Sequence, residues 1–358
     1  MSDAETQIQA GAVTSGFMGS IHLDERETVF AVQCLAGEGK VTLTGKTSDQ
    51  SLKQALLDKM AAIRGVSVVD QVVVLPAASL GDRTYGIVKL PVINLGDGPG
   101  SAGGSHTVTQ ARMGDVLRLL DLTDGWYLAQ MDDSYLGWVD PEDIFAIAKA
   151  ELDSFWSGRV ALVSAKTAES LTSPGGERAF RTDLVQGSVL PIAGVKGQWT
   201  TLKVPGGGEV WVKSSQVKEF AQVKDVFAEK KGAEGVIATA CQYVGLPYLW
   251  GGTTVLGFDC SGLTQFAFKM NGYRLRRDAD LQYEQGEPVA DRKSLQPGDL
   301  VFFQTYRQGA SHVGIYVGDS RYIQAGSSGL SMLSFNPADP DYSANLDKAY
   351  LGARRIIK

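Results

Sequence analysis

The chain has 358 residues, 44% of them hydrophobic and 21% charged, and a formal net charge of −6. This length exceeds that of one typical hydrophobic core and predicts two to four compact units of ordinary soluble, globular composition. The acidic balance, without a basic cluster, argues against nucleic acid and anionic membranes as partners, and no apolar run approaches the roughly 20 residues that span a bilayer.

The N-terminus and the cysteines bear on the cellular compartment. Residues 1–7 carry neither a basic n-region nor an apolar h-region, so we expect no signal peptide. The three cysteines are odd in number and irregularly spaced, which predicts no disulfide framework and no metal site, and nothing in the sequence requires a cofactor. We expect Cys34 and Cys241 to be small buried hydrophobic residues and the protein to be cytoplasmic, although a trimmed secreted precursor would look the same.

The first pattern along the chain is a strand–helix–strand unit within residues 1–80. Residues 41–45 predict a strand, residues 50–63 have apolar residues at helical spacing, and residues 66–75 are rich in β-branched residues, which is typical of a second strand. We therefore expect a small α/β N-terminal domain. The unit resembles half of a BON domain, a likeness from which no chemistry follows.

Two segments after residue 83 are copies of one another. A Gly-x-Val-Leu run, a tryptophan and a terminal Trp-Val strand occur at residues 114–117, Trp126 and residues 137–139, and each recurs 73 residues later. Short β-branched strands between Gly/Asp turns predict two small all-β barrels, at residues 84–146 and 157–221. These barrels resemble tandem bacterial SH3-like domains.

Two further expectations concern the ends of these barrels. Trp138 and Trp211 lie in alternating strands, so we expect them to pack in the barrel cores, with a ligand-facing surface as the alternative. The charged residues 223–231 predict a linking helix.

From Gly232 the pattern changes to that of an α+β domain that continues to residue 358. A helix is expected at residues 234–244, and a second at residues 260–270, where apolar residues recur at i, i+3, i+4 and i+7 and Gly272 follows the last turn. Strands are expected at residues 299–303, 312–317 and 320–325.

Cys260 opens the second of these helices, and His312 opens a later strand. A thiolate is the nucleophile in cysteine hydrolases, and an adjacent base and a helix N-terminus lower the pKa of the thiol, so we expect a thiolate–imidazolium pair. The strand at His312 reverses at residues 318–319, which places Gln324 nearly opposite on the next strand, where it can orient the imidazole. The order Cys, His, polar residue is that of papain-like cysteine hydrolases.

Four motifs within residues 232–358 resemble those of the NlpC/p60 peptidase family. They are residues 247–252, 258–263, 297–303 and 311–316. The resemblance implies that Cys260 is the nucleophile and His312 the general base. It also implies that Gln324 occupies the third position, where the family most often has His. Tyr248 matches the tyrosine whose hydroxyl forms the oxyanion hole with the backbone N–H of the nucleophile.

Two SH3-like domains ahead of such a domain resemble the γ-D-glutamyl-L-diamino-acid endopeptidases that recycle murein peptides. This likeness implies that Asp259, Ser261 and Tyr135 bind the free amino group of an N-terminal L-Ala. The family's acidic residue in the first SH3-like domain aligns with His106, a departure for which Asp115 or Asp97 is a candidate replacement. Trp250, Asp278 and Ser311 fall at substrate-lining positions. The alternatives are core aromatics of a tight turn for Tyr248 and Trp250, and a surface position without a binding role for Asp278.

The sequence therefore predicts a cysteine peptidase that cleaves the γ-D-glutamyl–diamino-acid bond of murein-derived peptides with lysine or diaminopimelate in third place. The alternatives are a non-catalytic peptidoglycan-binding protein, a hydrolase of intact cell wall, and amidase or acyl-transfer chemistry at the same thiol.

Overall fold

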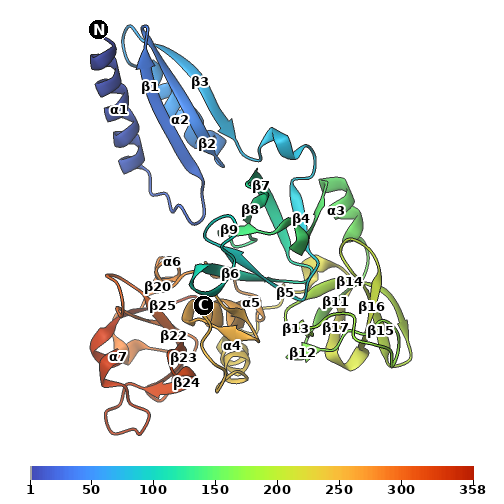
Figure 1. The fold of residues 1–358 in the computed structure, drawn as a ribbon. Helices are drawn as coiled ribbons and strands as arrows, with labels where there is room; N and C mark the ends of the chain where they lie inside the picture. The colour runs from blue at the N-terminus through green and yellow to red at the C-terminus, as the bar shows by residue number, and fades with distance from the viewer. Residues whose placement is uncertain (1) are drawn as a thin grey trace.

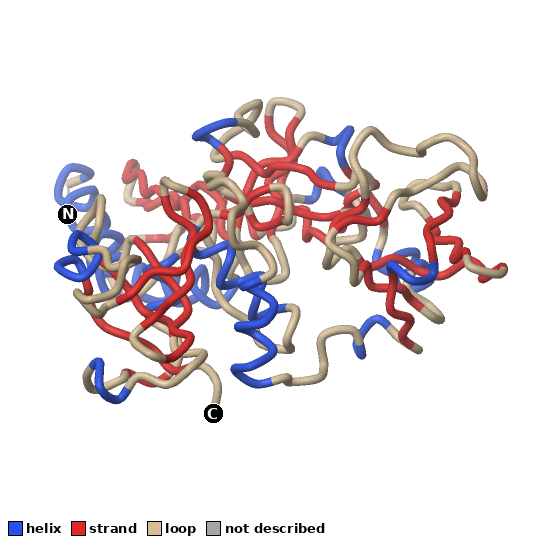
Figure 2. The backbone as a smooth tube through the Cα atoms, turned by 90° about the horizontal axis from the view of Figure 1, so that it is seen from below, coloured by secondary structure: helices blue, strands red, loops and turns tan. Residues whose placement is uncertain are grey.

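The computed structural model describes residues 2–358, which form four units in chain order (Figure 1). Figure 2 shows that the two middle units consist almost entirely of strands and loops, while longer helices lie in the first and last units. No helix in this described part of the chain is both long and apolar enough to cross a membrane.

The first unit is an arm that carries the N-terminus away from the rest of the molecule (Figure 1). Its three-stranded sheet has the order β1-β2-β3, with β2 and β3 parallel and joined by α2, which confirms the predicted strand–helix–strand unit. Helix α1 was not predicted; it begins with a capping box between Ser2 and Glu5 and packs on the sheet. The elements are α1 (Asp3–Ser20), β1 (Phe30–Gly37), β2 (Lys40–Thr47), α2 (Gln50–Ala61) and β3 (Ser67–Val74).

The second unit is a seven-stranded antiparallel sheet that curls around one apolar core. Its strand order is β10-β4-β7-β8-β9-β5-β6, and Leu117, Ala129 and Val139 are fully buried in the core. The strands are β4 (Tyr85–Val88), β5 (Val92–Gly96), β6 (Thr107–Arg112), β7 (Val116–Thr123), β8 (Trp126–Gln130), β9 (Leu136–Val139) and β10 (Ile144–Ile147).

The third unit repeats this arrangement. Its sheet order, β16-β15-β14-β11-β17, matches β9-β8-β7-β4-β10, and its buried residues Leu190, Leu202 and Val212 lie 73 positions after their counterparts. Helix α3 (Lys149–Phe155) joins the two units. The strands are β11 (Val160–Val163), β12 (Thr167–Ala168), β13 (Leu184–Val185), β14 (Val189–Lys196), β15 (Trp199–Lys203), β16 (Glu209–Lys213) and β17 (Val217–Phe220).

Four residues and one segment differ from what the sequence predicted. Trp138 and Trp211 are half-buried and outside both cores, because the valines that follow them in β9 and β16 occupy the inward positions. Cys34 is half-buried in β1, and Cys241 is exposed at the end of α4. Residues 223–231 form a short 3-10 turn and a loop instead of a linking helix.

The last unit carries a six-stranded antiparallel sheet, β20-β25-β21-β22-β23-β24, against which α5 packs. Leu263 and Phe266 of α5 meet Val313 and Ile315 of the sheet in one core. The elements are α4 (Gly232–Cys241), β18 (Thr253–Thr254), β19 (Gly257–Phe258), α5 (Cys260–Lys269), α6 (Ala279–Tyr283), β20 (Glu287–Pro288), β21 (Leu300–Phe303), β22 (His312–Gly318), β23 (Arg321–Gly326), β24 (Gly329–Ser334), α7 (Ala344–Ala349) and β25 (Tyr350–Arg355).

Strand β6 of the second unit joins it to the last unit. Thr253 donates from its backbone N–H to the Gln110 side chain at 3.1 Å and from its hydroxyl to the Gln110 carbonyl at 3.2 Å. Arg277 reaches across to donate to the Thr109 hydroxyl at 3.1 Å. These buried contacts fix the first barrel beside the start of α5.

Candidate active site

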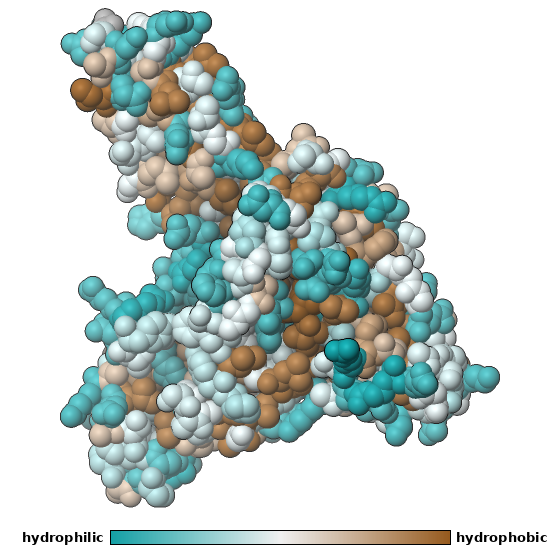
Figure 3. All heavy atoms as spheres, in the orientation of Figure 1, coloured by the Kyte–Doolittle hydropathy of each residue, from teal (hydrophilic) through white to brown (hydrophobic). Residues whose placement is uncertain are grey.

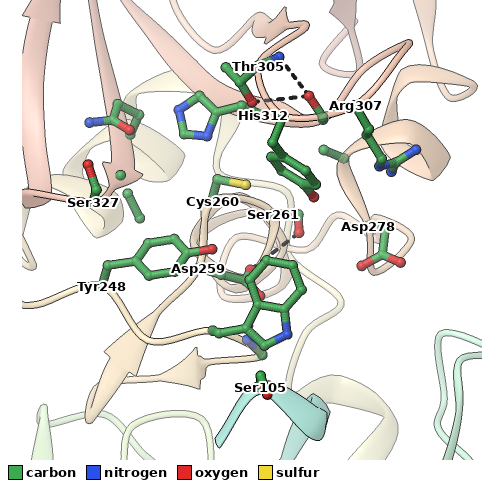
Figure 4. A pocket seen from close by; sticks show the side chains of 18 of the residues that line it. Ser105, Tyr248, Asp259, Cys260, Ser261, Asp278, Thr305, Arg307, His312 and Ser327 are labelled. Carbon is green, nitrogen blue, oxygen red and sulfur yellow. Dashed lines mark hydrogen bonds between the residues drawn. The ribbon is translucent and has the colours of Figure 1, made fainter. Parts of the chain in front are cut away.

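The predicted nucleophile lies where α5 begins. Asp259 caps the helix by accepting a hydrogen bond from the Gly262 N–H at 2.6 Å, so Cys260 is the first helical residue. The first N–H groups of a helix have no intrahelical partner, and they leave donors beside the thiol. Cys260 is 8% exposed and lines a cavity of about 900 Å³ (Figure 4), which His312, Gln324 and Tyr248 also line.

His312 and Gln324 come together on neighbouring strands, with a register that differs from the predicted one. Gln324 pairs with Gly314, so it lies diagonally from His312 on the same face instead of directly opposite. Gly326 makes room for this arrangement, since a Cβ there would lie 2.6 Å from Oε1 of Gln324. The Gln324 amide is held from its other side, where Nε2 donates to the Ser331 hydroxyl at 3.0 Å.

The His312 imidazole and the Gln324 amide each have a buried polar atom that can hydrogen-bond to the other. Nε2 of His312 and Oε1 of Gln324 are both buried and lack a well-formed partner within residues 2–358. The Gln324 side chain interacts with the imidazole and favours its protonated form. Gln324 is therefore placed to accept from Nε2–H, which leaves Nδ1 to take a proton from the thiol.

Burial determines the protonation state of the pair. It raises the pKa of the Cys260 thiol to about 12, and the nearby Asp259 charge acts in the same direction, against backbone N–H groups of Val313 and Ser261. Burial also lowers the pKa of His312 to about 4. The substrate-free protein thus favours a neutral thiol and a neutral imidazole over the ion pair expected from the sequence, because the helix N-terminus does not offset desolvation. His312 is then a general base during attack.

Tyr248 completes the reactive end of the cavity. A β-bridge to Phe258 holds it beside the residues that lead into α5, and Figure 4 shows its hydroxyl directed toward Cys260. Burial, and after it the nearby charge of Asp259, raise the pKa of this phenol, so it stays protonated and can donate. The Tyr248 hydroxyl and the Cys260 backbone N–H are suitable donors for an oxyanion.

A buried ion pair joins the site to the first barrel. Arg277 is 1% exposed; its Nη2 donates to Asp259 Oδ2 at 2.5 Å, and its Nη1 donates to Asp259 Oδ1 at 3.1 Å and to the Ser261 hydroxyl at 3.0 Å. The Gly251 and Gly262 N–H groups also donate to this carboxylate. Asp259 and Ser261 line the cavity as predicted, but the charge and acceptor sites of Asp259 are already taken.

Asp278, unlike Asp259, has a carboxylate oxygen that is still able to accept a hydrogen bond from a substrate. Its Oδ2 accepts from the Tyr135 hydroxyl at 2.8 Å and from Nη1 of Arg26 at 2.7 Å, while Oδ1 accepts no hydrogen bond from the described residues. The sequence pointed to Tyr135 and Asp278 but missed Arg26, which comes from the N-terminal arm. No sequence signal marks a contact between residues 252 positions apart.

The remaining predicted residues occupy the edge of the cavity. Trp250 is 48% exposed and contacts Tyr306 edge-on, with ring centroids 6.3 Å apart, at the mouth. Ser311 lines the wall, but its hydroxyl accepts a hydrogen bond from the Thr305 N–H at 2.8 Å and so shapes the loop at residues 304–311.

His106 stands where the related peptidases have an acidic residue, and Asp97 beside it supplies a carboxylate instead. His106 is exposed and contacts Asp97 through Nδ1 and Oδ2 at 2.9 Å, and Asp97 lines the cavity whereas Asp115 does not. Hydrogen bonds from His106 and Ser101 lower the pKa of Asp97, so its carboxylate stays ionised. The first barrel therefore still presents an acid to the cavity.

Comparisons with known proteins agree with this geometry. Residues 245–355 match the NlpC/P60 family, and residues 101–144 match the bacterial dipeptidyl-peptidase SH3 domain. The chain thus carries an NlpC/P60 peptidase domain together with an SH3 domain of the bacterial dipeptidyl-peptidase type. The first barrel is thus an SH3-type domain, and the last unit is the NlpC/P60 catalytic domain.

Several relatives of this peptidase are similar over more than the catalytic domain. A γ-D-glutamyl-L-lysine dipeptidyl-peptidase of Bacillus cereus is 27% identical over 260 residues, 70% of this chain and 75% of that protein. One from Bacillus subtilis is 37% identical over 173 residues, 47% of this chain and 54% of its own length. The crystal structure of an NlpC/P60 family protein from Bacillus cereus shares the fold, with a TM-score of 0.66 at 22% identity, over 76% of this chain and all of that one.

The protonation state of the pair can be tested by alkylation. Because burial raises the pKa of Cys260 to about 12, we expect its alkylation rate by iodoacetamide to rise steadily from pH 6 to pH 10, without a plateau. The measurement is mass-spectrometric labelling of a variant in which Cys34 and Cys241 are replaced by Ser. A rate already constant between pH 5 and pH 8 would show a preformed ion pair and contradict the neutral resting state.

The unequal roles of His312 and Gln324 give a second test. We expect His312→Ala to lower kcat by about 100- to 10,000-fold, the usual cost of losing a general base, and Gln324→Ala to lower it less, because Gln324 only orients the imidazole. Gln324→His restores an imidazole partner and should retain more activity than Gln324→Ala. A Gln324→Ala loss as large as that of His312→Ala would contradict the assignment.

Proposed function

We propose that this protein hydrolyses the bond between γ-D-Glu and the L-diamino acid of short murein peptides that begin with a free L-Ala. The observation that carries the proposal is that Cys260, Asp97, Tyr135 and Asp278 share one cavity, so the first SH3-type domain walls the substrate site at a fixed distance from the nucleophile. The γ-D-glutamyl-L-lysine dipeptidyl-peptidases among its relatives support the same bond and the same peptide length.

The proposed reaction uses four groups of the cavity. His312 accepts the thiol proton as Sγ of Cys260 attacks the γ-carbonyl carbon, and the resulting oxyanion accepts from the Tyr248 hydroxyl and the Cys260 N–H. His312 then donates that proton to the leaving amine of the diamino acid, which departs and leaves a thioester. Water attacks the thioester with His312 again as base, releasing L-Ala-γ-D-Glu and the free thiol.

The charges at the far end of the cavity suit an ammonium group. Asp24, Asp278 and Asp280 surround the two guanidinium groups of Arg26 and Arg307, which leaves one net negative charge there. Asp97, which also lines the cavity, adds a second negative charge. A substrate ammonium can donate a charge-assisted hydrogen bond to Oδ1 of Asp278, which an amide-linked lactyl group cannot do.

We also propose a domain organisation for the chain and a cellular compartment for the reaction. We infer an N-terminal α/β domain with a BON-like half at residues 1–80, SH3-like domains at residues 84–146 and 157–221, and the catalytic domain at residues 232–358. The shared strand order and the constant 73-residue offset support the second SH3-like assignment. A pocket closed at the amine end suits peptides already released from the glycan, and we propose that the protein acts on them in the cytoplasm during murein recycling.

The test is cleavage of L-Ala-γ-D-Glu-L-Lys and its diaminopimelate counterpart, followed by mass spectrometry of the released dipeptide. We expect dipeptide release by the wild type and none by Cys260→Ala, whose thermal midpoint should stay near that of the wild type. N-acetylation of the peptide should lower kcat/KM by about 100-fold or more, since the acetyl group removes the ammonium charge and needs extra space.

Three outcomes would contradict the proposal in different ways. Binding without cleavage would show a peptidoglycan-binding protein. Equal kcat/KM for free and acetylated peptides would refute the closed pocket and favour a hydrolase of intact wall. Turnover retained in Cys260→Ala would remove the thiol as nucleophile.

A further inference from the structure

A second cavity borders the proposed substrate pocket. It has a volume of about 580 Å³ and lies between the segment that follows α1 and the first residues of α6. Among residues 2–358, Arg26 and Arg307 are the two that line both cavities. Their side chains therefore form the partition between the pocket that holds Cys260 and the neighbouring space. Figure 4 shows Arg307 and Asp278 at the end of the pocket away from Tyr248.

The Arg26 side chain is held rigidly in this partition. Its Nε donates to Asp24 at 2.8 Å, Nη1 donates to Asp278 at 2.7 Å and to Asp280 at 3.1 Å, and Nη2 donates to Asp24 at 2.5 Å and to Asp280 at 2.9 Å. A guanidinium group has five N–H donors, and all five are used here. Arg26 consequently has no N–H donor left to bind an anionic group of a substrate. Its side chain instead blocks the end of the pocket.

The backbone around Arg26 is clamped from both sides. The Leu136 N–H donates to the Arg26 carbonyl at 2.7 Å, and the Gln130 side chain donates to the Glu27 carbonyl at 2.8 Å, both from the first SH3-type domain. From the catalytic domain, Arg276 donates twice to the Glu27 carboxylate, at 2.8 and 2.7 Å. The surface where the arm meets the catalytic domain is accordingly hydrophilic (Figure 3).

Arg307 contributes the second half of the partition. It pairs with Asp280 at 3.0 Å, the same carboxylate that accepts from Arg26. One aspartate thus holds both guanidinium groups side by side between the two cavities.

We propose that Arg26, supplied by the N-terminal arm, is a specificity-determining residue that closes the amine end of the substrate pocket. This inference rests on the proposed function and deepens it. A peptide with a free N-terminal L-Ala ends at the partition, with its ammonium beside Asp278. A peptide carrying one more residue must pass through the position of Arg26 into the second cavity. The N-terminal arm therefore sets the length of peptide that the catalytic domain accepts.

The test compares Arg26→Ala with the wild type on two peptides, L-Ala-γ-D-Glu-L-Lys and the same peptide extended by an N-terminal Gly. Removing the side chain joins the two cavities, so kcat/KM for the extended peptide should rise by about tenfold or more, while that for the tripeptide falls. A gain of activity on one substrate cannot arise from misfolding. Arg307→Ala, which removes the other half of the partition, should also raise activity on the extended peptide.

Glu27→Gln is the matched control, because it weakens the clamp of the same segment without altering the partition. We expect it to leave the ratio of the two kcat/KM values unchanged. No gain in either arginine variant, or an equal gain in Glu27→Gln, would overturn the role of Arg26 while leaving the proposed function intact. Failure of the wild type to cleave the tripeptide would overturn both.

Discussion

The buried ion pair between Arg277 and Asp259 organises the rest of the site. An arginine that is 1% exposed is destabilising unless its charge and donors are matched, and Asp259, Ser261 and Thr109 supply the partners. Because Asp259 also caps α5, the pair fixes the first turn of the helix and hence the position of Cys260. Because Thr109 belongs to β6, the same arginine fixes the first SH3-type domain against the catalytic domain. Removing either charge would leave the other buried without the opposite charge that it is paired with.

Three units separated in the chain therefore build one pocket. The catalytic domain supplies the nucleophile, base and oxyanion donor, the first SH3-type domain supplies Tyr135 and Asp97, and the N-terminal arm supplies Arg26. The third unit of the fold does not line this pocket within residues 2–358. It packs closely against the first barrel. At Gly114, for example, a Cβ would lie 1.9 Å from the Val189 carbonyl oxygen and would force the two barrels apart.

Features that depend on local pattern could be predicted from the sequence, whereas those that depend on packing could not. The helix that starts at Cys260, the strand that starts at His312 and the 73-residue repeat follow from periodicity and turn residues, and the structure confirms them. The charge state of Cys260 could not be predicted, because desolvation outweighs the helix N-terminus only once the thiol is seen to be buried. The partners of Arg26 depend on how three units dock, which no spacing within the chain encodes.

The amine end of the pocket is closed by Arg26 of the N-terminal arm together with Arg307 of the catalytic domain. The most direct measurement is a crystal structure of the Cys260→Ala variant with L-Ala-γ-D-Glu-L-Lys bound. We predict the alanine ammonium within hydrogen-bonding distance of Asp278 and facing Arg26, with the scissile carbonyl oxygen beside the Tyr248 hydroxyl. A peptide whose N-terminus instead points away from Asp278 and into solvent would contradict this account.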